Sequence, residues 1–286
     1  MSKKKEEYRD LKLTAHEYTC LSEGYYETGL FDSALECAEN VLYLYRRDPS
    51  SVSDEEQSYC VRMRARILSK NCEKKEWKRA FKAAERLTKK QKDEVSYADC
   101  LVDKGTAYAC IGRDKKAVRL RKKALKVLEG NQDGDEVKKE ALYLLGSAYY
   151  AKKDDKKADK YFSEAYDLGD ATDELLFMLG SVKVRKGEYE RAVDYLIQCR
   201  AMREEKYREM PFHAALGEIY LLLGDVYSMM KVYVKAVKLY AKALRTYEIE
   251  GGDEVGYVET CKRLYGTYKI LGEEDRAESF LMRVEE

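Results

Sequence analysis

Residues 141–170 read ALYLLGSAYYAKKDDKKADKYFSEAYDLGD, in which a polar turn joins two segments with apolar residues at helical spacing. Gly146 and Tyr149 lie in the first segment, and Ala158 and Ala165 lie in the second. The small residues permit two helix backbones to approach closely, and the large ring fills the space beside that contact. The stretch therefore predicts two antiparallel helices.

The same pattern recurs along the whole chain. Its shared alanine lies at Ala34, Ala80, Ala117, Ala158, Ala192, Ala236 and Ala277, at intervals of 46, 37, 41, 34, 44 and 41 residues. A period near 40 residues is typical of a helical solenoid. We predict one all-α domain over residues 1–286, with residues 1–14 extending the first helix. The predicted repeats are roughly 15–60, 61–97, 98–138, 139–172, 173–216, 217–257 and 258–286.

Two further positions keep this register. Twelve residues before the alanine, where two helices should touch, the chain has Ser22, Gly105, Gly146, Gly180 and Gly224. Five residues before it, where the first helix should end in a left-handed conformation, the chain has Gly29, Gly112, Gly187 and Gly272. The second and last repeats depart from the pattern, with Leu68 and Tyr265 at the small position.

Composition agrees with a helical, intracellular protein. Only 2 Pro accompany 17 Gly and 107 charged residues, 54 basic and 53 acidic, which excludes an all-β or collagen-like chain. No apolar run approaches the roughly 20 residues that span a bilayer, and the start MSKKKEEYRD lacks the apolar stretch of a signal peptide. The 8 scattered cysteines contain no CxxC pair. We therefore expect reduced thiols in a cytoplasmic, reducing compartment.

The segments 141–170 and 175–199 carry a resemblance to the tetratricopeptide repeat family, in particular to its longer-repeat members. The resemblance covers essentially residues 15–286. It implies a right-handed superhelix whose first helices line a concave groove and whose second helices cover the convex back. Proteins of this family mostly bind an extended peptide or a helix of another protein, so the resemblance implies a non-enzymatic adaptor or scaffold.

A row of acids marks the predicted groove. The residues that stand 18 positions before the shared alanine are Asp99, Glu140, Glu174, Glu218 and Glu259. Beside them we place the groove residues Tyr143, Ser147, Tyr150, Phe177, Ser181, Leu221 and Asp225. One interpretation is a protein-binding groove for a basic or amphipathic segment. The other is that acids favour the first turn of any helix and that the aromatic residues belong to the core.

A well-known groove of the family clamps the acidic tail of heat-shock chaperones with Lys and Asn. The corresponding faces here present Thr19, Glu23 and Ser69, with Arg62 and Arg66 as cations. We therefore predict no chaperone-tail partner.

Residues typical of catalysis are scarce. The two histidines, His16 and His213, are far apart, so no paired-histidine metal spacing exists. Cys37 and Cys199 fall on second-helix faces where a small apolar thiol substitutes for alanine. No glycine pattern for phosphate binding follows a strand. We expect no enzyme activity, no metal and no cofactor.

Charge distribution supplies the alternative function. Residues 61–126 contain 22 Lys or Arg against 8 Asp or Glu, a net charge of +14 in a chain whose total is +1. The predicted basic patch comprises Lys78, Arg79, Lys82, Arg119, Lys122, Lys123 and Lys126, on the convex side. It suits nucleic acid or an anionic surface. The alternative is a solvated face that keeps the protein soluble.

The last repeat ends in an apolar helix without a polar capping helix after it. Leu271, Phe280 and Leu281 are expected to lie on its outer side. Such a patch commonly marks an interaction site. We expect a second copy, another protein or further polypeptide to cover it. The alternative is that the charged residues of this helix, Glu278, Arg283, Glu285 and Glu286, make the exposed side polar enough.

Overall fold

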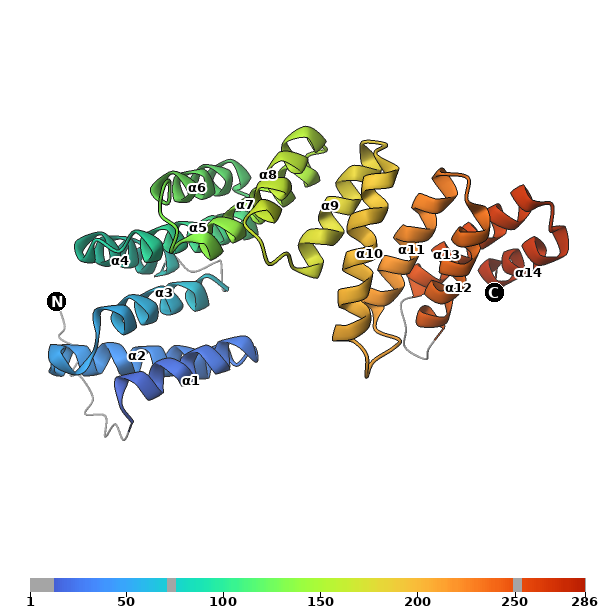
Figure 1. Cartoon of the computed structure of the whole chain (residues 1–286). Coiled ribbons are helices and arrows are strands. Elements are labelled where there is room, and N and C mark those ends of the chain that lie inside the picture. Colours follow the sequence, from blue (N-terminus) through green and yellow to red (C-terminus); the bar gives the residue numbers. More distant parts are fainter. Residues whose placement is uncertain (1–12, 71–75, 249–253, 286) are drawn as a thin grey trace. The chain divides into compact units, whose positions relative to one another are not determined.

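The computed structural model describes residues 13–70, 76–248 and 254–285, which form fourteen α-helices and no strand (Figure 1). The first six are α1 (Ala15–Glu27), α2 (Phe31–Arg47), α3 (Asp54–Lys70), α4 (Glu76–Gln91), α5 (Glu94–Cys110) and α6 (Asp114–Val127). A 3-10 helix, Pro49–Ser51, follows α2. The remaining helices are α7 (Asp135–Ala151), α8 (Asp155–Asp167), α9 (Asp173–Arg185), α10 (Tyr189–Lys206), α11 (Ala214–Met229), α12 (Tyr233–Tyr247), α13 (Glu254–Leu271) and α14 (Glu274–Glu285).

The chain divides into two compact units, residues 1–141 and 142–286, with the boundary inside α7. Consecutive helices pack as pairs, from α1 with α2 through α13 with α14. The prediction of an all-α array of about seven helix pairs is therefore confirmed. None of the helices described is long and apolar enough to cross a lipid bilayer.

Several first helices begin before the predicted repeat starts. The helices α3, α5, α7, α11 and α13 begin at residues 54, 94, 135, 214 and 254, where the sequence indicated 61, 98, 139, 217 and 258. Polar first turns, such as Asp135 and Glu136 in α7, lie outside the apolar periodicity because the helix dipole favours acids there. Most of the predicted extension at 1–14 lies outside the described residues. Thr14 and Glu17 form a capping box, so α1 begins at Ala15.

Residues with a left-handed backbone conformation follow the first helices, as predicted. Gly29, Gly112, Gly187 and Gly272 have φ between 69° and 79°. Lys153 and Lys231 occupy the equivalent position with φ of 59° and 63°. The turn is therefore imposed by the packing of the pair even where glycine is lacking.

The two helices of a pair approach closely at the predicted small position. A methyl group at Gly146 would lie 2.6 Å from the Phe162 ring, and one at Gly224 would lie 2.5 Å from the Tyr240 ring. Both rings are fully buried. At Ser22 the hydroxyl instead donates a 2.8 Å hydrogen bond to the carbonyl oxygen of Ala34. Each contact thus joins the two helices through a nearly bare stretch of backbone.

The helices of each unit form two layers. In the first unit α1, α3 and α5 contact one another along the stack, whereas α2, α4 and α6 pack against first helices. In the second unit α9, α11 and α13 form the same continuous row, with α10, α12 and α14 behind them. The first helices are therefore the inner layer of each unit. We refer to the side of α9, α11 and α13 that faces away from the second helices as the inner face of the second unit.

We predict that Gly224→Ala destabilises the second unit. The added methyl group must displace the buried Tyr240 ring, so the free energy of unfolding should fall by about 1–3 kcal/mol. Gly266→Ala is the matched control, because a Cβ at this helical glycine meets nothing within 4 Å. It should raise the free energy of unfolding by about 0.5–1 kcal/mol. Urea denaturation followed by circular dichroism measures both, and equal effects would contradict the close-contact interpretation.

Candidate partner-binding surfaces

The five acids of the predicted row lie on successive first helices. They are Asp99 on α5, Glu140 on α7, Glu174 on α9, Glu218 on α11 and Glu259 on α13. Four of them form ion pairs: Asp99 with Arg62, Glu174 with Lys206 at 3.5 Å, Glu218 with Arg203 at 3.4 Å and Glu259 with Arg263 at 2.7 Å. Glu140 is exposed. The row is thus partly neutralised by bases that the sequence analysis had not connected with it.

Arginine and aspartate alternate on the inner layer of the first unit. Arg62 and Arg66 of α3 pair with Asp99 and Asp103 of α5, the second pair at 3.1 Å. The Arg66 guanidinium also lies 4.8 Å from the centre of the Tyr26 ring. The carboxylates of the next repeat therefore engage both arginines, and the absence of a chaperone-tail partner stays a prediction.

Asp103 is the most buried acid of this group. Burial raises its pKa to about 6, although Arg66 and Arg62 lower it. Glu140 adds to the rise through charge repulsion. Ionisation of Asp103 is therefore opposed by its surroundings at mildly acidic pH.

A charge network ties the inner layer of the second unit to α10. Nε of Arg203 donates to Asp173 at 3.0 Å, and its NH1 donates to the carbonyl oxygen of Ala215 at 2.8 Å. Lys206 donates a second hydrogen bond to Asp173 at 3.2 Å. Although burial opposes ionisation, the bonds from Arg203 and Lys206 hold the pKa of Asp173 below its usual value. Arg203 is therefore held by a buried carboxylate and a backbone carbonyl, whereas its third partner, Glu218, keeps a side chain that is 56% exposed.

Three of the predicted groove residues cluster on α7. Ser147 donates a 2.9 Å hydrogen bond to the carbonyl oxygen of Tyr143. The Tyr143 ring packs 5.8 Å from the Phe162 ring, and the Arg185 guanidinium covers the Tyr150 ring at 4.2 Å. All three side chains are half-buried, so each has only one side available to a ligand.

The predicted groove residues of α9 and α11 form hydrogen bonds or apolar contacts within the protein itself. Ser181 is buried, and its hydroxyl donates to the carbonyl oxygen of Phe177 at 2.8 Å. Leu221 packs into the core around α11 and α12. Asp225 accepts 2.8 Å hydrogen bonds from Tyr240 and Arg263. Phe177 is half-buried on α9, packs against the same core as Leu221, and has the Arg203 guanidinium 4.7 Å from the centre of its ring.

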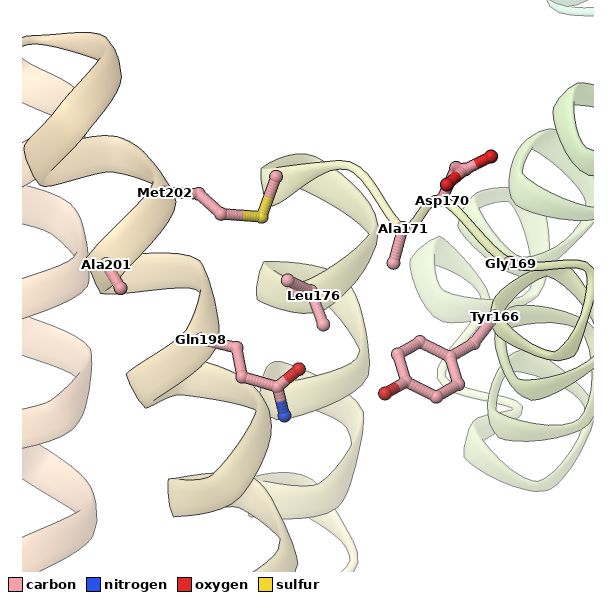
Figure 2. Close-up of a pocket in the computed structure, with 8 residues that line it drawn as sticks. All are labelled: Tyr166, Gly169, Asp170, Ala171, Leu176, Gln198, Ala201 and Met202. Atoms are coloured by element: carbon pink, nitrogen blue, oxygen red, sulfur yellow. The ribbon is translucent and has the colours of Figure 1, made fainter.

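An open pocket that the sequence did not indicate lies at the junction of α8, α9 and α10. It has a volume of about 560 Å³ and is lined by Tyr166, Gly169, Asp170, Ala171, Leu176, Gln198, Ala201 and Met202. Figure 2 shows the Tyr166 hydroxyl and the Gln198 amide facing the opening from opposite sides. Leu176 and Met202 give it an apolar wall. Because its residues come from a loop and three helices, only tertiary packing assembles it.

The predicted basic patch lies on two second helices of the first unit. Lys78, Arg79 and Lys82 are on α4, and Arg119, Lys122, Lys123 and Lys126 are on α6. All seven side chains are exposed. Lys123 donates a 2.8 Å hydrogen bond to the Tyr97 hydroxyl. The patch therefore faces outward, on the layer opposite the arginine and aspartate pairs of α3 and α5.

The histidines and the buried cysteines have structural surroundings. His213 caps α11 and stacks on Tyr207, while His16 is exposed beside Glu56. No group of three or more metal-ligating side chains occurs in the part of the chain that the structure describes. Burial raises the pKa of Cys199 to about 11, which makes its thiol a poor nucleophile at neutral pH.

Two further buried thiols behave alike. Burial raises the pKa of Cys60 to about 11 and that of Cys100 to about 12. Cys72 lies outside the described residues.

The C-terminal helix pair exposes part of the apolar patch named above. Leu271 is 37% exposed and Leu281 38%, whereas Phe280 is half-buried against the Tyr268 ring at 5.8 Å. Ile270 and Met282 add to the patch, each 61% exposed. A covering partner for this end remains a prediction.

Two family profiles, both described as tetratricopeptide repeat, match residues 139–168 and 171–249. No curated protein sequence matches the chain significantly.

Solved structures share the fold at low sequence identity. The apo form of RapI is 15% identical with a TM-score of 0.67, and the similarity covers 94% of this chain and 75% of RapI. A signal transduction ATPase with a tetratricopeptide repeat sensor, from Pyrococcus horikoshii, is 14% identical with a TM-score of 0.71, over 94% of this chain and 42% of that one. YrrB, described as having an unusual peptide-binding site, is 18% identical with a TM-score of 0.52, over 65% and 83%. These similarities establish the fold alone.

We predict that Asp103 gives the first unit a measurable pH dependence. Because its folded pKa is raised from 3.8 to about 6, its stabilising contribution is complete below pH 3.8 and is lost as the pH rises through about 6. The loss should be on the order of 3 kcal/mol. Asp103→Asn should therefore show a flatter dependence of the urea midpoint on pH between about 4 and 7. Parallel curves for the two proteins would contradict the raised pKa.

Proposed function

This chain is a tetratricopeptide repeat protein, and we propose that it is a non-enzymatic adaptor that binds a segment of another protein on the inner face of its second unit. The observation that carries the proposal is the continuous row of α9, α11 and α13, in which each first helix contacts the next. Stacked helix pairs present such extended surfaces, whereas most enzymes enclose their substrates in a deep pocket.

The inner face of the second unit offers charge and apolar surface together. The carboxylates of Glu174 and Glu218 have side chains 52% and 56% exposed. Half-buried Phe177 and Leu222 lie on the same helices. A basic or amphipathic segment fits this combination, because its cations can pair with the carboxylates while its apolar side contacts the rings and leucines.

Glu218 is the acid with the most to contribute. Its partner Arg203 is already bound to Asp173 and to a backbone carbonyl, so a ligand cation can bind Glu218 without unpairing a buried charge. Glu174 pairs at 3.5 Å with Lys206, whose side chain is 48% exposed and also donates to Asp173. A preformed face of this kind reduces the ordering cost of association.

We predict that Glu174→Lys with Glu218→Lys removes binding of selected ligands. A displayed library of random peptides would be panned on the parent, with basic or amphipathic sequences expected to enrich. Their affinity for the double variant should fall at least about tenfold, because attraction becomes repulsion at two positions. Circular dichroism checks that the helical content is retained.

The matched control reverses Lys122, Lys123 and Lys126 to Glu on α6. These side chains lie on the outer layer of the first unit, so the selected peptides should bind this variant as they bind the parent. Retained binding by the inner-face variant, or loss of binding by the α6 variant alone, would move the site away from the inner face of the second unit.

A further inference from the structure

Two second helices of the first unit present twelve exposed cations. They are Lys78, Arg79, Lys82, Arg86, Lys89 and Lys90 on α4, with Lys115, Lys116, Arg119, Lys122, Lys123 and Lys126 on α6. We call these twelve residues the α4/α6 basic surface. None of the eleven residues other than Lys122 forms an ion pair with a carboxylate in the described part of the chain. These eleven side chains therefore carry a positive charge that the fold does not neutralise.

The second helices differ in how they mix acids with bases: α12 has Lys235, Lys238, Lys242 and Arg245 and no acid, whereas α8 carries both signs. On α8 and just before it, Lys157 pairs with Asp154 at 2.6 Å and Lys160 with Glu164 at 3.7 Å. The α4 helix has only Glu76 and Glu85 as acids, and Glu85 is taken by Lys104 of α5. The α8 helix thus shows that an exposed second helix of this protein can carry acids and bases together, whereas α4 carries mostly bases.

The spacing of the charges adds a cost. Lys78, Lys82, Arg86 and Lys90 are four residues apart, which puts them in one line about 6 Å apart along α4. Like charges at this spacing destabilise a helix by about 0.2–0.5 kcal/mol per pair. Folding alone does not account for such a row, whereas binding to a line of negative charges does.

Tyr97 of α5 connects the charges of the two helices. Nζ of Lys89 lies 4.9 Å from the centre of its ring, and Nζ of Lys123 lies 5.4 Å from it. Lys123 also donates a hydrogen bond to the Tyr97 hydroxyl. The cations of α4 and α6 therefore meet over one buried ring and form a single surface.

The chemistry of the surface selects among anionic partners. No large apolar side chain on the described α4 or α6 is exposed, and Trp77 is only 1% exposed. A protein interface needs aromatic or apolar anchors at its centre, and stable attachment to a membrane needs an inserted chain besides the charge. Phosphate contacts need cations alone, and a duplex carries about one charge per 1.7 Å. Unstacked bases would require exposed rings.

We propose that the α4/α6 basic surface binds the phosphate backbone of a nucleic acid duplex without reading its sequence. This role is independent of the adaptor function, because it uses the outer layer of the first unit. A peptide selected on the inner face of the second unit would still bind if this proposal failed.

The test measures binding of labelled random-sequence DNA and RNA duplexes by the full chain, by fluorescence anisotropy at several salt concentrations. The test variant carries Lys82→Glu, Arg86→Glu, Arg119→Glu and Lys126→Glu. The parent should bind with a Kd in the range of about 1–100 μM at physiological salt, and the logarithm of its affinity should fall linearly with that of the salt concentration. In the variant, affinity should fall at least about tenfold and the salt slope should lose about 3–4.

The control variant has the same net charge but reverses Lys152, Lys156, Lys238 and Arg245 in the second unit, all of which are exposed. It should retain most of the binding. Equal loss in both variants would show attraction by net charge and overturn the proposal. Vesicles containing phosphatidylserine and soluble polyglutamate are the competing probes. Failure of the parent to bind duplex at low salt, or tighter binding to either competing probe at equal charge, would also overturn it.

Discussion

The close approach of two helices within each pair limits which side chains fit between them. Where the first helix has Gly146, the second presents the Phe162 ring against bare backbone. In the second repeat the sizes are exchanged, since Leu68 belongs to the first helix and Ala84 stands 16 residues later, in the core cluster against which Leu68 packs. In these two repeats a small residue meets a larger one in either order, which lets divergent sequences keep a close helix contact.

That contact fixes the spacing of the repeats and so determines which charges meet. Arg62 reaches Asp99, and Arg66 reaches Asp103, across 37 residues in each case. Asp225 accepts from Arg263 across 38 residues. All three pairs join successive first helices, so the inner layer of each unit is bound by charge as well as by apolar packing. Leaving one partner unpaired at such positions is costly, because the low dielectric of the interior strengthens every uncompensated charge.

The two layers of the first unit therefore differ in how their charges are placed. On the inner layer, α3 supplies arginines and α5 supplies the aspartates that neutralise them. On the outer layer, the lysines of α4 and α6 are exposed, and water screens their charge. The inner layer of the second unit lies between these extremes, because Asp173 is buried against Arg203 of α10 while Glu218 is 56% exposed. Exposed charge that the fold does not use is what remains for binding.

The helix pairs, their number and their turns were predictable from the sequence, because the alanine, the small residue and the left-handed stop are local signals that repeat in register. The outward position of Lys122 and Lys126 followed from the same helical period. Only the tertiary structure decided that the acidic row is largely paired, since Asp99 and Arg62 meet only when two repeats stack. It also decided the pocket beside Tyr166 and the burial of Ser181. Both depend on contacts between residues far apart in the sequence, and such contacts do not appear as a periodic pattern.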